Sequence, residues 1–189
     1  MSGRGGSLRV IAGSLKGRRL LGPAWPGLRP TSDQLRETLF NILAARMPGA
    51  RVLDAYAGTG AVGIEALSRG ASHVTFVEQD RRAQALVVEN LARCGVADGY
   101  AIIRASVARA CKAFAAGEFD IVFLDPPYAD DASRVQSVLE CVAAATADAG
   151  LVVLEHARKR PAPDPGGRLV RSRVVEAGDS ALTFFACRP

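Results

Sequence analysis

The sequence lacks the features of several protein classes. It has no apolar run near the roughly 20 residues that a membrane helix needs, and residues 1–30 contain no apolar signal-peptide segment. Its four cysteines are far apart and form no C-x-x-C pair, and its two histidines are His73 and His156. These absences argue against a disulfide framework and a zinc site. We therefore expect a soluble, cytoplasmic protein without a membrane segment or a metal.

Acidic residues are also missing from one part of the chain. Residues 1–30 contain six basic residues and no acid, whereas the remaining 18 basic and 19 acidic residues nearly cancel within a net charge of +5. A second basic cluster lies at residues 158–173, against the single acid Asp164. Most of the basic residues are arginines, whose planar group suits phosphate and base stacking. This distribution favours a polyanionic partner over an ordinary solvated surface.

The order of the expected elements indicates an α/β protein. Residues 8–12 and 18–21 favour a short β-hairpin, and the Pro- and Gly-rich stretch that ends at Pro30 favours a linker. Thr31 and Gln34 fit a capping box that begins a helix reaching about Arg46. Strands are then expected at 52–53, 74–77, 101–104, 121–124 and 151–155, and helices at 60–69, 80–93, 106–115 and 132–145.

Alternating strands and helices predict a mostly parallel sheet with helices on both faces. Residues 169–176 and 181–187 have no helix between them, which predicts an antiparallel hairpin at the end of the chain. We accordingly predict two parts, a basic N-terminal arm with its linker at residues 1–30 and an α/β domain at residues 31–189.

The stretch 54–63, DAYAGTGAVG, contains the pattern G-x-G-x-x-G. Asp54 ends the first strand of the expected sheet, and open α/β sheets bind ligands beyond the carboxyl ends of their strands. Gly58 and Gly60 allow a ligand to approach the backbone at the start of a helix. Glu78 ends the second strand, where a carboxylate can accept hydrogen bonds from ribose hydroxyls. Both NAD and S-adenosylmethionine (SAM) contain such a ribose.

Two details of this loop favour SAM over NAD. In dinucleotide folds the first glycine follows the strand almost at once, because the pyrophosphate lies on the helix N-terminus. Here Ala55, Tyr56 and Ala57 intervene. The carboxylate of Asp54 would also repel a pyrophosphate, whereas it can hold the ammonium group of a methionine moiety.

A second motif, Asp125-Pro126-Pro127-Tyr128, follows the apolar strand 121–124. The two prolines remove backbone donors and stiffen the loop, so the motif presents acceptors, the Asp125 carboxylate and the Pro126 carbonyl, beside an aromatic ring. Acceptors that hold both hydrogens of an exocyclic amino group, with a ring stacked on the base, orient its nitrogen for attack on a methyl donor. The motif therefore predicts amino methylation of a base.

Together these segments resemble the class I SAM-dependent methyltransferases, and within them the small-subunit (16S) ribosomal RNA guanine-N2 methyltransferase family. The matching segments are RVIAGSLKGRRL (9–20), RPTSDQLRETLFNIL (29–43), VLDAYAGTGAVGIEALSRGA (52–71), VEQD (77–80) and FLDPPY (123–128). D-P-P-Y is shared by base and protein amino methylases, and the two N-terminal segments narrow the resemblance to this family.

The resemblance implies a Rossmann-like, seven-stranded methyltransferase sheet and methylation of guanine N2 in 16S rRNA on assembled or nearly assembled 30S particles, by a monomer. The expected cofactor-binding residues are Asp54, Tyr56, Ala57, Gly58, Gly60, Glu78, Gln79, Ser106 and Asp125. The expected catalytic residues are Asp125, Pro126, Pro127 and Tyr128, which would hold the guanine. The expected RNA-binding residues are Arg9, Lys16, Arg18, Arg19 and Arg29.

The sequence departs from the pattern at one place. Many class I enzymes carry an acid after the third strand that contacts the adenine amino group, whereas residues 104–107 read RASV, which leaves Ser106 or backbone amides for that contact. Three alternatives remain open. They are a DNA amino methyltransferase, a protein glutamine N-methyltransferase, which usually has Asn at position 125, and a non-catalytic SAM-binding module for RNA assembly.

Overall fold

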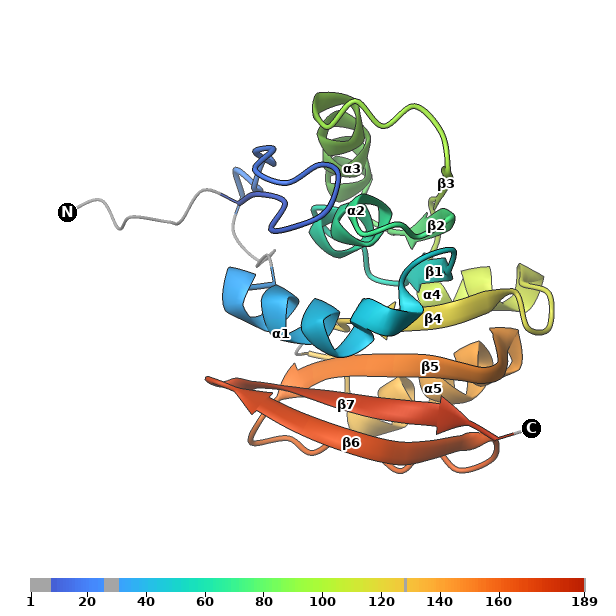
Figure 1. Ribbon diagram of the computed structural model, residues 1–189. Coiled ribbons are helices and arrows are strands. Elements are labelled where there is room, and N and C mark those ends of the chain that lie inside the picture. The colour runs from blue at the N-terminus through green and yellow to red at the C-terminus, as the bar shows by residue number, and fades with distance from the viewer. Residues whose placement is uncertain (1–7, 26–30, 128, 189) are drawn as a thin grey trace.

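A computed structural model describes residues 8–25, 31–127 and 129–188 of the chain. Its centre is a seven-stranded sheet in the order β3-β2-β1-β4-β5-β7-β6 (Figure 1). The strands are β1 (Arg51–Asp54), β2 (His73–Val77), β3 (Tyr100–Ile103), β4 (Phe119–Leu124), β5 (Thr146–Ala157), β6 (Leu169–Ala177) and β7 (Ser180–Cys187).

The sheet is mixed in the manner that the sequence predicts. Strands β1 to β5 pair in parallel, and β7 pairs antiparallel with both β5 and β6. Strands β1, β2 and β4 are mostly buried because helices cover both faces of the sheet, whereas β3, at the edge, is only partly buried. Strands β2 and β3 are added on one side of β1, and β4 and β5 on the other side. The carboxyl ends of the parallel neighbours β1 and β4 therefore lie side by side. The expected seven-stranded, mostly parallel sheet with its C-terminal antiparallel hairpin is confirmed.

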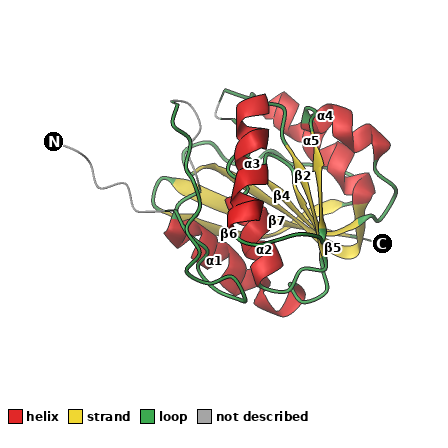
Figure 2. Cartoon of the chain, turned by 90° about the horizontal axis from the view of Figure 1, so that it is seen from above, coloured by secondary structure: helices red, strands yellow, loops and turns green. Residues whose placement is uncertain are grey.

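The helices form two layers, with α1, α2 and α3 on one side of the sheet and α4 and α5 on the other (Figure 2). Their bounds are α1 (Asp33–Leu43), α2 (Ala61–Ser68), α3 (Arg81–Arg93), α4 (Val107–Ala110) and α5 (Ala132–Ala145), with 3-10 turns at η1 (Ala44–Arg46) and η2 (Cys111–Ala113). Each layer has its own buried apolar cluster, one around Phe40 and Phe76, the other around Phe119 and Phe185. Every helix in the described ranges is too short or too polar to cross a bilayer.

The start of α1 differs from the prediction. Ser32, and not Thr31, is the N-cap, and its hydroxyl accepts a hydrogen bond from the Leu35 amide at 3.2 Å. Both residues can cap a helix, so the pattern alone could not choose between them. The shift by one residue leaves the Thr31 side chain outside the helix, where it lines a cleft.

The expected N-terminal hairpin is present in reduced form. Residues 8–20 turn back on themselves through one antiparallel bridge between Arg9 and Arg19, and the Val10 amide donates to the Arg18 carbonyl at 2.9 Å. Val10 and Leu20 are buried in the same cluster as α1 and α2. The described part of the arm is thus packed on the α/β domain, beside α2 and α3 (Figure 1). The boundary at residue 30 stays a prediction.

Candidate functional site

A cleft of about 840 Å³ opens at the carboxyl edge of the parallel strands. The loops after β1, β2, β3 and β4 line it, together with the end of β5 and the residues that precede α1. This is the edge at which open α/β sheets bind ligands. Among the expected cofactor residues, all but Gly60 line this cleft, and Gly60 lies in the same loop.

The glycine loop has the backbone shape that its sequence predicts. Gly58 and Gly60 have positive φ angles of 54° and 77°, which residues with a Cβ rarely adopt. The Gly60 amide closes a turn on the Ala57 carbonyl at 2.7 Å, and α2 begins immediately afterwards. A methyl group added at Gly63 would lie 2.2 Å from the Phe76 ring, so this glycine lets α2 approach β2 closely.

Asp54 lies at the base of this loop with only 1% of its surface exposed. Its Oδ2 accepts a hydrogen bond from the Gly63 amide in the first turn of α2, at 2.9 Å. Burial raises the pKa of Asp54 to about 7, against the opposing effect of this hydrogen bond. The protein's own carboxylate thus occupies the helix N-terminus on which the pyrophosphate of a dinucleotide would have to lie.

The Glu78 carboxylate links the loop after β1 to the loop after β2 through two hydrogen bonds. Its Oε2 accepts from the Gly58 amide at 2.9 Å, and its Oε1 accepts from the Asp80 amide at 2.8 Å. Both bonds hold the carboxylate at the rim of the cleft, directly beside the glycine loop. The position agrees with the expected role of an acceptor for ribose hydroxyls.

The remaining expected cofactor residues lie around the same cleft. Ser106 is the N-cap of α4, but its hydroxyl makes no capping hydrogen bond, which leaves it available to a ligand. Tyr56 is half-buried, and burial raises its pKa to about 12, so its hydroxyl stays protonated. Ala57 and Gln79 complete this wall.

The Asp125-Pro126-Pro127 segment lies opposite the glycine loop. Asp54 pairs with Phe123 across β1 and β4, so Asp125 lies two residues further along on the same face. Desolvation, followed by the charges of Glu155 and Asp54, raises the pKa of Asp125 well above its usual range. Three of the four expected catalytic residues, Asp125, Pro126 and Pro127, line the cleft. Tyr128 lies outside the described residues, as does Arg29.

Glu155, Thr31 and Ser180 also belong to the site, although the sequence analysis did not select them. The Thr31 hydroxyl lies close enough to Asp125 and Glu155 to lower the pKa of both carboxyl groups, and the Ser180 hydroxyl does the same for Glu155. Burial raises the pKa of Glu155 to about 7. The sequence does contain a pattern that could have identified Glu155, because this acid follows an apolar strand segment as Asp54 and Glu78 do.

Trp25 forms a further wall that the sequence did not predict. Its ring stacks on the guanidinium of Arg82 at 4.9 Å, and Arg82 in turn pairs with Asp80 at 2.9 Å. All three residues line the cleft. An aromatic ring from the arm therefore borders a cleft whose other walls come from the α/β domain.

The cleft brings together three desolvated carboxyl groups, each with a raised pKa. In the part of the chain that the structure describes, Asp54, Asp125 and Glu155 have no Arg or Lys within ion-pair distance. No group of three or more His, Cys, Asp or Glu residues in the same ranges has the arrangement of a metal site. A buried carboxylate is most stable when a positive charge compensates it, so this cleft suits a cationic organic ligand.

A separate basic surface lies on the arm. Lys16, Arg18 and Arg19 are exposed and surround a shallow depression, and Arg93 at the end of α3 completes it. We refer to these four residues as the basic surface. Arg93 was not among the predicted RNA-binding residues because its proximity to the arm arises only in the folded chain. Arg9, the bridge partner of Arg19, does not line this depression, and its side chain lies 3.9 Å from Asp33.

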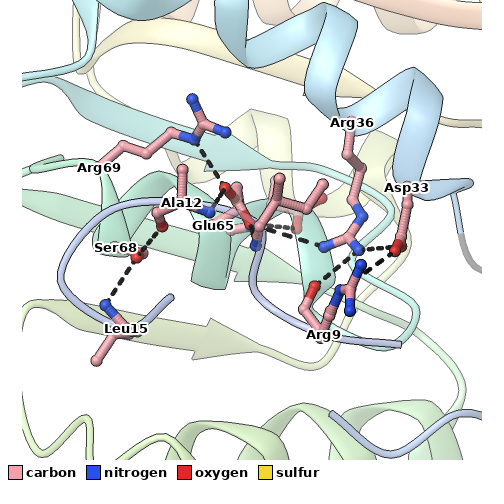
Figure 3. A network of polar contacts seen from close by, with 11 residues as sticks. Arg9, Ala12, Leu15, Asp33, Arg36, Glu65, Ser68 and Arg69 are labelled. Carbon is pink, nitrogen blue, oxygen red and sulfur yellow. Dashed lines mark hydrogen bonds and ion pairs between the residues drawn. The ribbon is translucent and has the colours of Figure 1, made fainter. Parts of the chain in front are cut away.

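A buried polar network joins the arm to the α/β domain (Figure 3). Glu65 of α2 accepts hydrogen bonds from the Ile11 and Ala12 amides at 2.7 and 3.0 Å and from Arg69 at 2.7 Å. Arg36 of α1 is fully buried, lies 3.8 Å from Glu65 and donates to the Arg9 carbonyl at 2.9 Å. The network therefore fixes the arm relative to α1, and Thr31, two residues before α1, lines the cleft with Asp125 and Glu155.

Comparison with known proteins agrees with this geometry. A family profile described as conserved hypothetical protein 95 matches residues 8–186. YlbH of Bacillus subtilis (strain 168), provisionally named as an rRNA methyltransferase, is 36% identical over 96% of this chain and 100% of its own length. Ribosomal RNA small subunit methyltransferase D of Escherichia coli (strain K12) is 45% identical over 65% of this chain and 61% of its length.

Solved structures give the same result for the fold. YhhF of Escherichia coli, provisionally named as a methyltransferase, superposes with a TM-score of 0.84 at 30% identity, covering 97% of this chain and 99% of that one. HI0767 of Haemophilus influenzae, provisionally named as a methylase, gives 0.78 at 27% identity over 97% and 100% of the two chains. Because the profile matches residues 8–186 and the similarity to YlbH covers 96% of the chain, this chain belongs to the conserved hypothetical protein 95 family, and the relatives reported above are named as methyltransferases.

Proposed function

We propose that the protein is a SAM-dependent methyltransferase that modifies the exocyclic N2 of a guanine in small-subunit (16S) rRNA, on the assembled or nearly assembled 30S particle. The observation that carries the proposal is the β1–β4 register, which brings Asp125 to the face and edge of the sheet occupied by the glycine loop and Asp54. The E. coli relative named ribosomal RNA small subunit methyltransferase D supports the rRNA substrate. Ribosomal RNA as a substrate places the protein in the compartment of ribosome assembly.

The residues of the cleft fit SAM. Asp54, desolvated and without a cationic partner among the described residues, can accept from an ammonium group, and Glu78 can accept from ribose hydroxyls. Ser106, with its hydroxyl not engaged in capping, can contact the adenine. When bound, SAM supplies an electrophilic methyl group on a positively charged sulfur. That charge favours the ionised forms of Asp54 and Asp125.

Asp125 has two tasks in this proposal. Its carboxylate accepts a hydrogen of the guanine amino group, as does the Pro126 carbonyl, and these bonds orient N2 toward the methyl donor. Asp125 also accepts the proton that N2 loses as the new N–C bond forms. Its raised pKa suits this second task, because a carboxylate with an ordinary pKa is a weaker base.

Transfer of a labelled methyl group tests the proposal. The protein is incubated with methyl-labelled SAM and, in parallel, with small ribosomal subunits, naked 16S rRNA, DNA and protein, and the products are digested and analysed by mass spectrometry. We expect N2-methylguanosine in the subunits, an initial rate lower by about 10²-fold or more with Asp125→Ala, and an unchanged rate with Asp98→Ala, an exposed control. N6-methyladenine in DNA, methylglutamine in protein or an absence of label would contradict the proposal.

A further inference from the structure

Glu155 is placed beside Asp125 by the register of the sheet. Strands β4 and β5 are parallel, and Leu124, the last residue of β4, pairs with Leu154. The residues that follow this pair, Asp125 and Glu155, continue the same register. Neighbouring strands lie about 4.8 Å apart, and paired residues point to the same face. Both carboxylates accordingly line the same cleft.

The environment of Glu155 is unusual for a structural acid. The residue is 6% exposed, and its Oε2 is buried without a hydrogen-bond partner among the described residues. The hydroxyls of Ser180 and Thr31 reach the carboxylate, but the Thr31 hydroxyl, which has one hydrogen, also faces Asp125. A buried acceptor without a donor is costly and calls for a ligand that supplies one.

We propose that Glu155 reads the target base: its carboxylate accepts the N1–H of the guanine whose N2 amino group is held by Asp125. The inference rests on the proposed guanine substrate and adds a specificity-determining residue to it. In guanine, N1–H and the N2 amino group are adjacent donors on one edge of the ring. Two acceptors on adjacent strands, one on Asp125 and one on Glu155, match this pair of donors.

The same arrangement disfavours other bases. Adenine presents an unprotonated N1 beside its amino group, and cytosine presents an unprotonated N3, so each would direct a lone pair at the Glu155 carboxylate. A site built to accept a substrate N–H rejects analogues that lack it far more strongly than an apolar pocket rejects a shape difference. Glu155 therefore distinguishes guanine from the other amino-bearing bases, whereas Asp125 alone accepts from any amino group.

A base analogue separates this role from a structural one. 2-Aminopurine keeps the 2-amino group of guanine but has no hydrogen on N1. Small subunits are reconstituted with rRNA that carries either guanine or 2-aminopurine at the position mapped with the wild-type protein, and kcat/KM is measured for both. We expect the wild-type protein to prefer guanine by about 10²-fold or more.

Glu155→Met removes the acceptor and keeps the volume of the side chain, so the site stays filled. It should lower kcat/KM for guanine by about 10²-fold and change that for 2-aminopurine by less than about threefold, so that the preference disappears. Glu155→Gln, whose amide oxygen can accept N1–H, should retain an intermediate preference. The matched control Glu140→Gln, on an exposed position of α5, should leave both values unchanged.

The outcomes distinguish the two proposals. If the wild-type protein methylates no guanine, the proposed function is wrong. If it methylates guanine but Glu155→Met lowers both substrates equally, or leaves the preference intact, then Glu155 has only a structural role and the inference is overturned. Binding of S-adenosylhomocysteine, measured by calorimetry, verifies that each variant retains the cofactor cleft. If Glu155→Met does not bind S-adenosylhomocysteine, the preference of Glu155→Gln for guanine over 2-aminopurine decides. A preference as large as that of the wild-type protein would again overturn the inference.

Discussion

At the carboxyl edge of the sheet, Asp54, Asp125 and Glu155 place desolvated carboxyl groups with raised pKa values in or beside a cleft. On the arm, Lys16, Arg18 and Arg19 place positive charge at exposed positions. Desolvated carboxyl groups interact strongly and shift one another's pKa, whereas exposed charges are screened by salt. In the proposed function the cleft therefore determines the chemistry and the base, and the basic surface determines affinity and position on the RNA.

The two regions are not independent, because Glu65 and Arg36 connect them. The largest effect that we predict comes from breaking this connection. Glu65→Ala leaves the fully buried Arg36 with Asp33, at 2.6 Å, as its remaining acid, and it leaves Arg69 and the Ile11 and Ala12 amides without their acceptor. Loss of one partner from a buried ion pair costs about 3–5 kcal/mol. Urea denaturation should show this loss in the free energy of unfolding.

The exposed acid Glu37 of α1 is a matched control, and Glu37→Ala should change the free energy of unfolding by less than about 0.5 kcal/mol. If Glu65→Ala costs under about 1 kcal/mol, the arm and the α/β domain are energetically separate. The arm could then unfold without unfolding the α/β domain.

The next prediction concerns the chemistry of the cleft. Asp125→Ala should lower turnover by about 10²-fold or more, because the amino group loses the acceptor of its proton. SAM affinity, measured by calorimetry, should stay within a few fold, since Asp54 and Glu78 are retained. A turnover near that of the wild-type protein would show that the D-P-P segment is only a rigid turn.

The dependence of stability on pH provides a third test. Burial raises the pKa of Glu155 in the folded protein to about 7, above its ordinary value of 4.5. Between these pH values the folded protein keeps a proton that the unfolded chain has lost, so this group makes the free energy of unfolding fall as pH rises from about 4.5 to 7. Glu155→Gln removes the titration and should therefore stabilise the protein by about 1–3 kcal/mol at pH 8, with little change at pH 4.5.

Denaturant titrations at the two pH values measure this difference. Glu140→Gln replaces an exposed glutamate and should show no such dependence. Equal stabilisation by Glu155→Gln at both pH values would mean that burial does not shift the pKa of this carboxylate.

The sequence predicts most of the fold because the local signals agree with one another. The apolar strands, the glycine turn and the acids that end β1 and β2 lie within segments short enough to be interpreted alone. The placement of Asp125 next to Glu155 could not be predicted in this way, because it depends on the register of two strands whose pairing is not local. Arg93 joins the basic surface for the same reason, since it is far from the arm in sequence.

The smallest effect that we predict is a change in RNA affinity at ordinary salt, caused by substitutions on the basic surface. If this surface neutralises about four phosphates, the logarithm of the RNA affinity should fall against the logarithm of the salt concentration with a slope of about −3 to −4. Arg18→Ala with Arg19→Ala removes two of these contacts and should make the slope shallower by roughly one to two units. SAM affinity should not change, because neither side chain lines the cleft.

Point substitutions are the sharper test here, since deletion of residues 1–21 would also remove Val10 and Leu20 from the core and the amides that Glu65 holds. Arg109→Ala with Lys112→Ala is a matched control, because it removes two exposed basic residues at α4 and η2, on the other side of the sheet. Binding to small subunits is measured at several salt concentrations for both pairs. If the control changes the slope as much as Arg18→Ala with Arg19→Ala, the arm does not direct the RNA contact. The cluster at residues 158–173 would then be the next surface to substitute, because it holds the second concentration of basic residues in the chain.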